Sequence, residues 1–202
     1  MREHRLLRLL VVAGSVFALI SRVAAGCGGS GASDPALKAR LAEANAHLTK
    51  SADYIKQLGG FKKSWTEALG AGVTPESVAK LKELLNGARK IEEQALGEIR
   101  AASRELASAR SLEVSDSMGT YLDMKLDAVD EQDKVLSTEL EAMDLRIQTA
   151  EAIGAGSQLD QATVLREQRI SQLEEESKQH TERAAELHKK ANEYYKNKKL
   201  GR

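Results

Sequence analysis

Apolar residues return at seven-residue intervals through most of this chain, in four segments that are separated by clusters of Gly and Ser. The clearest row is Leu122, Val129, Leu136, Met143 and Ala150, whose members are spaced by seven without a gap. An apolar repeat of seven places its side chains on one stripe of an α-helix, and this stripe packs against other helices. Aromatic residues make up only 3% of the chain, and such a composition is typical of long helices.

The breaks between the segments predict four helices of similar length, at about 35–69, 75–112, 117–153 and 158–198. Thr74 is an N-cap residue, and Pro75 then occupies the first helical position, where its missing N–H costs nothing. Segments of matched length joined by short Gly and Ser turns favour an antiparallel arrangement. We therefore predict an all-α fold, an up-down-up-down four-helix bundle with coiled-coil-like packing.

The break at 113–117 is the weakest of the three, and it lacks proline. If this stretch were helical, the second and third helices would fuse into one rod of about 79 residues and about 120 Å. The alternative fold is therefore an elongated three-helix coiled coil.

The first 27 residues have the layout of a secretory signal peptide. Three arginines within the first eight positions precede an apolar stretch at 9–20, and small residues at 23–26 lead to Cys27. An apolar stretch of this length is too short for a bilayer, which requires about 20 residues.

Ala25, Gly26 and Cys27 resemble the lipobox of bacterial lipoproteins, and this resemblance covers residues 1–27 only. It implies cleavage before Cys27 and attachment of a diacylglyceryl group, with palmitate-type acyl chains, to the Cys27 thiol. Since Cys27 is the only cysteine, an intramolecular disulfide is impossible. The resemblance also implies a membrane anchor in the cell envelope. Gly28 in place of Asp favours the outer membrane, with the protein facing the periplasm or the cell surface.

The domain organisation that follows has three parts. Residues 1–26 are the expected signal peptide, and residues 27–34 are the lipidated cysteine and a flexible polar tether rich in Gly and Ser. Residues 35–202 are the expected helical bundle.

The charges of the chain are balanced, with 30 basic and 30 acidic residues. Residues 1–26 hold four arginines and one glutamate, so the remainder carries 26 basic and 29 acidic residues and a formal net charge of −3. Proteins dedicated to nucleic-acid binding usually have a strong basic excess, so nucleic acid is not an expected partner.

Catalytic, cofactor and metal motifs are absent from the sequence. No Glu lies three residues before any of the four histidines, as a di-iron bundle would require, and neither a CxxCH nor an HExxH motif occurs. We therefore expect a protein that is not an enzyme and has no cofactor.

Several polar residues interrupt the apolar rows. Arg166 and His180 interrupt the row of the last segment, and Asp133 interrupts that of the third, while Glu92 and Gln132 are further interruptions. One hypothesis is a polar core layer, with Asp133, Arg166 and His180 as candidates, that binds a ligand or senses pH. The other is a set of contacts that fix the register, or a partly solvated edge of the bundle.

The end of the last predicted helix is basic and contains two tyrosines. In a four-helix bundle this end returns to the side of the lipid anchor, where aromatic and basic side chains suit anionic head groups. The candidate residues for contact with head groups or the cell wall are Tyr194, Tyr195, Lys196, Lys198 and Lys199. The alternative is pairing of this end with acidic residues at the start of the third helix, such as Asp116 and Asp123.

These observations favour a lipid-anchored, non-enzymatic binding or scaffold protein of the cell envelope. Its expected partners are the membrane, through Cys27, and an unidentified envelope protein or the cell wall; the oligomeric state stays open. A second hypothesis is a spacer that ties membrane to cell wall, similar to the murein lipoproteins, which share a lipobox, aliphatic heptads and a basic, Tyr-containing C-terminus. A third hypothesis is a sensor of a small ligand.

Overall fold

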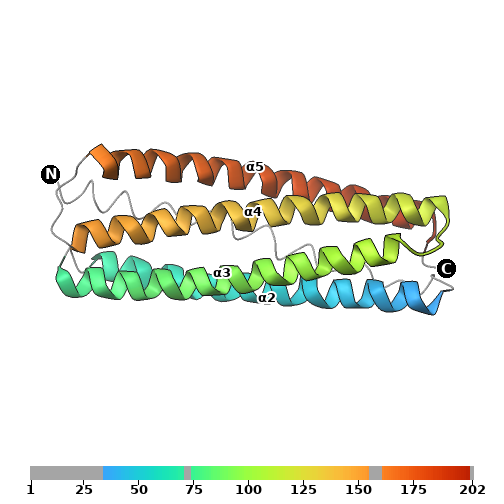
Figure 1. Ribbon diagram of the computed structural model, residues 1–202, viewed down its shortest axis with the longest axis horizontal. Helices are drawn as coiled ribbons and strands as arrows, with labels where there is room; N and C mark the ends of the chain where they lie inside the picture. The colour runs from blue at the N-terminus through green and yellow to red at the C-terminus, as the bar shows by residue number, and fades with distance from the viewer. Residues whose placement is uncertain (1–33, 71–73, 155–160, 201–202) are drawn as a thin grey trace.

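The structure is a computed structural model that describes residues 34–70, 74–154 and 161–200, apart from the side chains of 62, 63 and 65–70. The described residues form four helices and no strand: α2 (Pro35–Gly70), α3 (Pro75–Arg110), α4 (Asp116–Gly154) and α5 (Gln161–Asn197). The helices lie lengthwise along one another (Figure 1). The predicted antiparallel four-helix bundle is confirmed, and each helix begins and ends within about three residues of its predicted bounds.

Helix α3 begins at the predicted cap. The Ser77 amide donates to Thr74 Oγ1 at 3.1 Å, and the Thr74 amide donates to Ser77 Oγ at 2.8 Å. This reciprocal pair is a capping box, with Pro75 at the first helical position. Two amides that the helix itself leaves unpaired are thereby satisfied.

The chain leaves the helix between α3 and α4, so the fused rod does not form. The Ser115 carbonyl accepts from the Gly119 amide at 2.8 Å, and Ser115 Oγ accepts from the Met118 amide at 3.3 Å. Gly119 also allows a close approach, because a Cβ there would lie 3.2 Å from Cζ of Arg110. The alternative of a three-helix coiled coil is therefore wrong, because Ser115 and Gly119 start a new helix.

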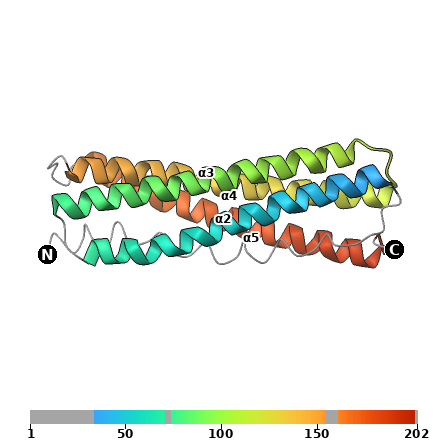
Figure 2. The same ribbon diagram turned by 90° about the horizontal axis from the view of Figure 1, so that it is seen from below.

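The bundle consists of two helical hairpins, α2–α3 and α4–α5, which are joined by packing of α3 against α4. Helices α2 and α5 do not form a packed pair and lie at opposite edges in Figure 1, although they cross in projection in Figure 2. The start of α2 and the end of α5 lie at the same end of the bundle (Figure 1).

The apolar core divides into two clusters along the bundle. The larger cluster extends from Leu37 to Ile55 on α2 and reaches Ala95 on α3 and Leu136 on α4. The smaller cluster begins one turn further along, and its buried members are Leu58, Leu81, Leu85, Ala88, Met143 and Ala150. The predicted row from Leu122 to Ala150 is buried throughout. The gap between the clusters falls at the level of Glu92 and Glu139.

None of the described helices contains an apolar stretch long enough to cross a membrane.

Candidate functional site

Glu92 of α3 lies inside the bundle without a hydrogen-bond donor. It continues the row of Leu85, Ile99 and Leu106, is 0% exposed, and neither carboxyl oxygen has a hydrogen-bond partner among the described residues. Burial raises the pKa of Glu92 to about 8, the charge of Glu139 raises it further, and Arg146 opposes both. Because an unpaired carboxylate is costly to bury, Glu92 holds its proton at neutral pH.

Glu139 of α4 connects this region to α5. Ser177 Oγ, which is fully buried, donates to Glu139 Oε1 at 2.6 Å. Burial raises the pKa of Glu139, whereas the hydrogen bond from Ser177 and the charge of Arg146 lower it. Of the two buried carboxyl groups, Glu139 is therefore the one whose ionised form is stabilised by a hydrogen-bond donor.

Arg146 of α4 is the buried cation of this region. Its guanidinium donates to Glu174 Oε1 of α5 at 2.5 Å, and its charge also lowers the pKa of Glu92, Glu139 and Glu167. The guanidinium of Arg146 is thus the cation that stabilises four carboxyl groups, those of Glu92, Glu139, Glu167 and Glu174. The region is short of positive charge and of hydrogen-bond donors.

A second buried polar contact joins α4 to α5 nearer the 111–115 turn. Lys125 Nζ lies 3.1 Å from His188 Nδ1, and both side chains are buried. Burial lowers the pKa of His188 to about 3, and the charge of Lys125 lowers it further. The imidazole is therefore neutral, so its Nδ1 accepts from the ammonium group.

These buried polar residues of α4 share one row of the helix. Lys125, Gln132, Glu139 and Arg146 are spaced by seven and all are buried. Sequence reasoning identified Gln132 but not the row, because four polar residues at that spacing resemble a solvated face. A search for polar as well as apolar residues at intervals of seven would have found it.

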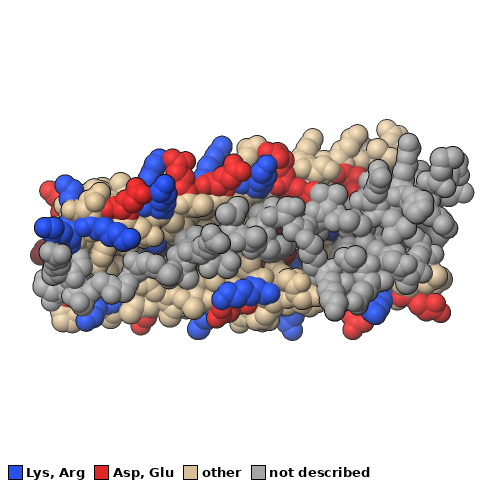
Figure 3. Space-filling model, turned by 180° about the vertical axis from the view of Figure 1, so that it is seen from behind, with Lys and Arg blue, Asp and Glu red and all other residues tan. Residues whose placement is uncertain are grey.

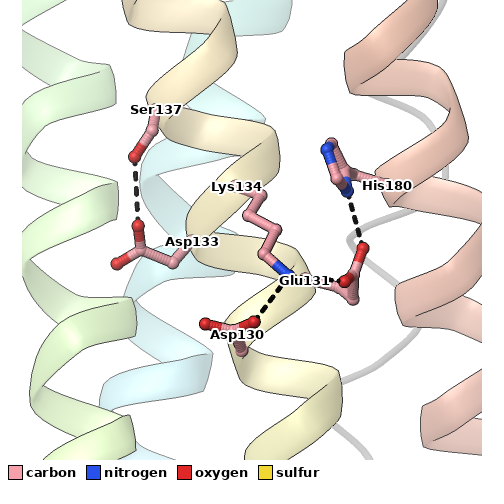
Figure 4. Close-up of polar contacts among 6 residues, drawn as sticks. All are labelled: Asp130, Glu131, Asp133, Lys134, Ser137 and His180. Carbon is pink, nitrogen blue, oxygen red and sulfur yellow. Dashed lines mark hydrogen bonds and ion pairs between the residues drawn. The ribbon is translucent and has the colours of Figure 1, made fainter.

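The three predicted core-layer residues do not form a layer. Asp133 pairs with Arg100 of α3 at 2.8 Å and accepts from Ser137 at 3.0 Å, whereas His180 Nδ1 lies 2.6 Å from Glu131. Figure 4 shows Asp133 and His180 on opposite sides of α4. Asp133 and His180 each have a charged partner at the edge of the bundle, and these contacts keep both side chains out of the core.

Arg166 also lies apart from the other two candidates. It is half-buried, and its Nη1 is 3.5 Å from Thr163 Oγ1 of the same helix. It precedes His180 by two heptads, which is about 21 Å along α5. The structure therefore does not bring Asp133, Arg166 and His180 together.

Ion pairs along the α3–α4 contact explain the acidic character of α4. Cations of α3 pair with anions of α4 at four levels: Lys82–Glu151, Arg89–Asp144, Arg100–Asp133 and Arg110–Asp123, at 2.6–2.9 Å. The predicted pairing of Asp123 with the basic end of α5 is therefore replaced by pairing with Arg110. Lys190 of α5 instead pairs with Glu186 of its own helix.

The end of α5 combines packed tyrosines with exposed lysines. The rings of Tyr195 and Tyr121 are 4.9 Å apart, and Tyr194 also packs against the larger cluster, with Lys198 Nζ 5.9 Å from its ring centre. The exposed residues are Lys196, Lys198 and Lys199, none of which makes an ion pair with a described residue. The tyrosines therefore stabilise the bundle, and the lysines are the available contact groups.

Within the described ranges, no group of three His, Cys, Asp or Glu side chains is placed to hold a metal ion. Comparison of the chain with protein families, with curated proteins and with solved structures gave no match. Cys27 and the predicted signal peptide lie outside the described residues, so lipidation stays a prediction.

Proposed function

We propose that this chain is a lipid-anchored protein of the bacterial cell envelope, and that its bundle is a non-enzymatic binding or scaffold module. The observation that supports this proposal most strongly is the position of the two ends of the bundle. Helix α2 begins at the end where α5 stops (Figure 1), so the chain that leaves Cys27 enters the bundle beside the lysines of α5.

The tether keeps this end close to the proposed anchor. Asp34, the first described residue, follows Cys27 by seven positions, which corresponds to at most about 25 Å of extended chain. Lys and Arg side chains lie at this end of the molecule, at the left of Figure 3, with Asp and Glu side chains among them. A lysine near an anionic membrane surface contributes about 1 kcal/mol of binding. The three exposed lysines would therefore hold the base of the bundle against the head groups.

The same topology favours a scaffold over a spacer. A spacer similar to the murein lipoproteins would carry its basic end away from the membrane, whereas α5 returns to the start of α2. The longest helix, α4, has 39 residues and so measures about 58 Å. The exposed sides of such helices offer a long surface for a protein partner.

The experiment that tests the proposal is metabolic labelling of the full chain in a bacterium with an alkyne analogue of palmitate. We expect the label and the protein in the membrane fraction, and loss of both in Cys27→Ser. The matched control is Ser30→Ala in the tether, which should be labelled like the wild type. An unlabelled wild-type chain, or a Cys27→Ser variant that stays in the membrane fraction, would overturn the proposal.

A further inference from the structure

Each helix contributes one buried polar side chain to the middle of the bundle. Ion pairs of α2 with α3, Arg40–Glu105 and His47–Glu98, set a register that places Ser51 level with Glu92. Ser51 is 1% exposed, and its hydroxyl has no hydrogen-bond partner in the part of the chain that the structure describes. We name Ser51, Glu92, Glu139 and Ser177 the central layer; its members on α3 and α4 lie between the two apolar clusters.

The charges that act on Glu92 come from one neighbouring helix. They are Glu139, Arg146 and Asp144, all of α4, and the guanidinium of Arg146 is bound to Glu174 of α5. On the α2 side the charged groups nearest to Ser51 in the sequence are Lys50, Asp53 and Lys56. All three are exposed, and Asp53 pairs with Lys56. No charge of α2 therefore compensates Glu92.

Among the described residues, the Glu92 carboxyl group has neither a cationic partner nor a hydrogen-bond donor. Buried oxygens without a described partner also occur about two to three helical turns from the central layer, at Gln132 Oε1, Thr149 Oγ1 and Glu167 Oε1. A proton is the smallest group that supplies both, and it needs no cavity. It converts the Glu92 carboxylate into a neutral donor.

We propose that the central layer is a proton-controlled contact between the two hairpins. While Glu92 carries a proton, the α2–α3 hairpin packs on the α4–α5 hairpin; loss of this proton opens the contact about the link at 111–115. The opening occurs between α3 and α4, because Glu92 and Glu139 lie on these two helices, whose packing joins the hairpins. Ionised Glu92 would place two like charges across that interface.

The pH dependence follows from linkage. The pKa of Glu92 is raised to about 8 in the closed form, and in the open form it returns toward its ordinary value of about 4.3. The ratio of open to closed molecules therefore rises about tenfold per pH unit between roughly pH 5 and 8 and is constant above that range. The pairs His47–Glu98 and His180–Glu131 also titrate, but each lies within one hairpin.

Pulsed EPR between two spin labels tests the proposal on the full chain with Cys27→Ser, which has no other cysteine. The labelled positions are Lys90→Cys on α3 and Lys178→Cys on α5, both exposed. From pH 5 to 9 we expect the distance distribution to lengthen and broaden while circular dichroism shows unchanged helix content. Glu92→Gln should stay short at every pH, and the exposed control Glu83→Gln should behave like the wild type.

A second variant distinguishes the proposed cause from general alkaline instability. Glu139→Gln removes the like charge opposite Glu92, so opening should move to higher pH. Constant distances in the wild type would overturn the proposal, and so would an identical opening in Glu92→Gln. Closure at high pH on addition of an alkylammonium salt would also contradict it, because it would identify the layer as a site for an organic cation.

Discussion

Glu92 of α3 and Glu139 of α4 share one buried layer, and only Glu139 has a hydrogen-bond donor, the hydroxyl of Ser177. Their charges repel each other across the contact that joins the two hairpins. On α3 and α4 this layer lies between the two apolar clusters of the core. A contact of this kind makes the closed bundle depend on the protonation of one side chain.

Replacement of Glu92 with Gln should stabilise the bundle at pH 8 by roughly 2–4 kcal/mol. The raised pKa of Glu92 means that its contribution is present at low pH and is lost as pH rises toward 8. Gln has nearly the same shape and no charge, so the gain should be small at pH 5. Urea unfolding followed by circular dichroism at both pH values measures it, and an equal effect at the two pH values would contradict this reasoning.

His188 should make the bundle sensitive to acid. Its folded pKa is lowered to about 3, below its unfolded value, so its contribution is present above about pH 6.5 and is lost as pH falls toward 3. Thermal melting of His188→Gln should therefore depend less on pH in this range than melting of the wild type. Parallel melting curves for the two proteins between pH 7 and 4 would show that His188 is not responsible.

Arg146→Ala should be far more damaging than removal of an arginine at the surface. Arg146 is buried and bound to Glu174, so its loss leaves uncompensated carboxyl groups and costs about 3 kcal/mol or more. Arg100→Ala is the matched control, because its pair with Asp133 is solvent-exposed and contributes about 0.5 kcal/mol. Equal unfolding midpoints for the two variants would refute the assignment of Arg146 to the core.

Substitution of Lys196, Lys198 and Lys199 with Gln should weaken binding to anionic vesicles. The measurement is co-sedimentation of the Cys27→Ser chain with vesicles of phosphatidylglycerol and phosphatidylcholine at low and high salt. Lys50, Lys80 and Lys90 are exposed and lie on other helices, so their triple Gln variant makes the same change in charge elsewhere. An equal loss of binding in both variants would mean that net charge, and not the end of α5, determines attachment.

The helices were predictable because their signals are local. Thr74 and Pro75 define the start of α3, and the spacing of Leu122 and Val129 defines the buried stripe of α4. The least certain prediction was the turn between α3 and α4. Ser115 accepts hydrogen bonds from the amides of Met118 and Gly119, and these bonds begin a new helix after the turn.

The sequence predicted that polar residues interrupt the core, but it did not predict most of the residues that do so. Glu92 was found because it interrupts an apolar row, whereas Lys125 and Arg146 were missed because four polar residues follow one another in their row, between Met118 and Ile153. That row is buried because α4 packs against both α3 and α5, which is a property of the tertiary arrangement. Asp133 and His180, the candidates for a polar core layer, each lie at the edge of a contact with a charged partner, which fits the second hypothesis of contacts at a partly solvated edge.

Titration of the Glu92 side chain by carbon-13 NMR tests the central claim, the buried neutral carboxyl, most directly. The signal of its carboxyl carbon is assigned as the one that disappears in Glu92→Gln. We predict a midpoint well above the ordinary glutamate value and below the closed-form pKa of about 8, because opening is coupled to loss of the proton. A midpoint near the ordinary glutamate value of about 4.3 would mean that Glu92 is ionised at neutral pH, and the proton-controlled contact would be refuted.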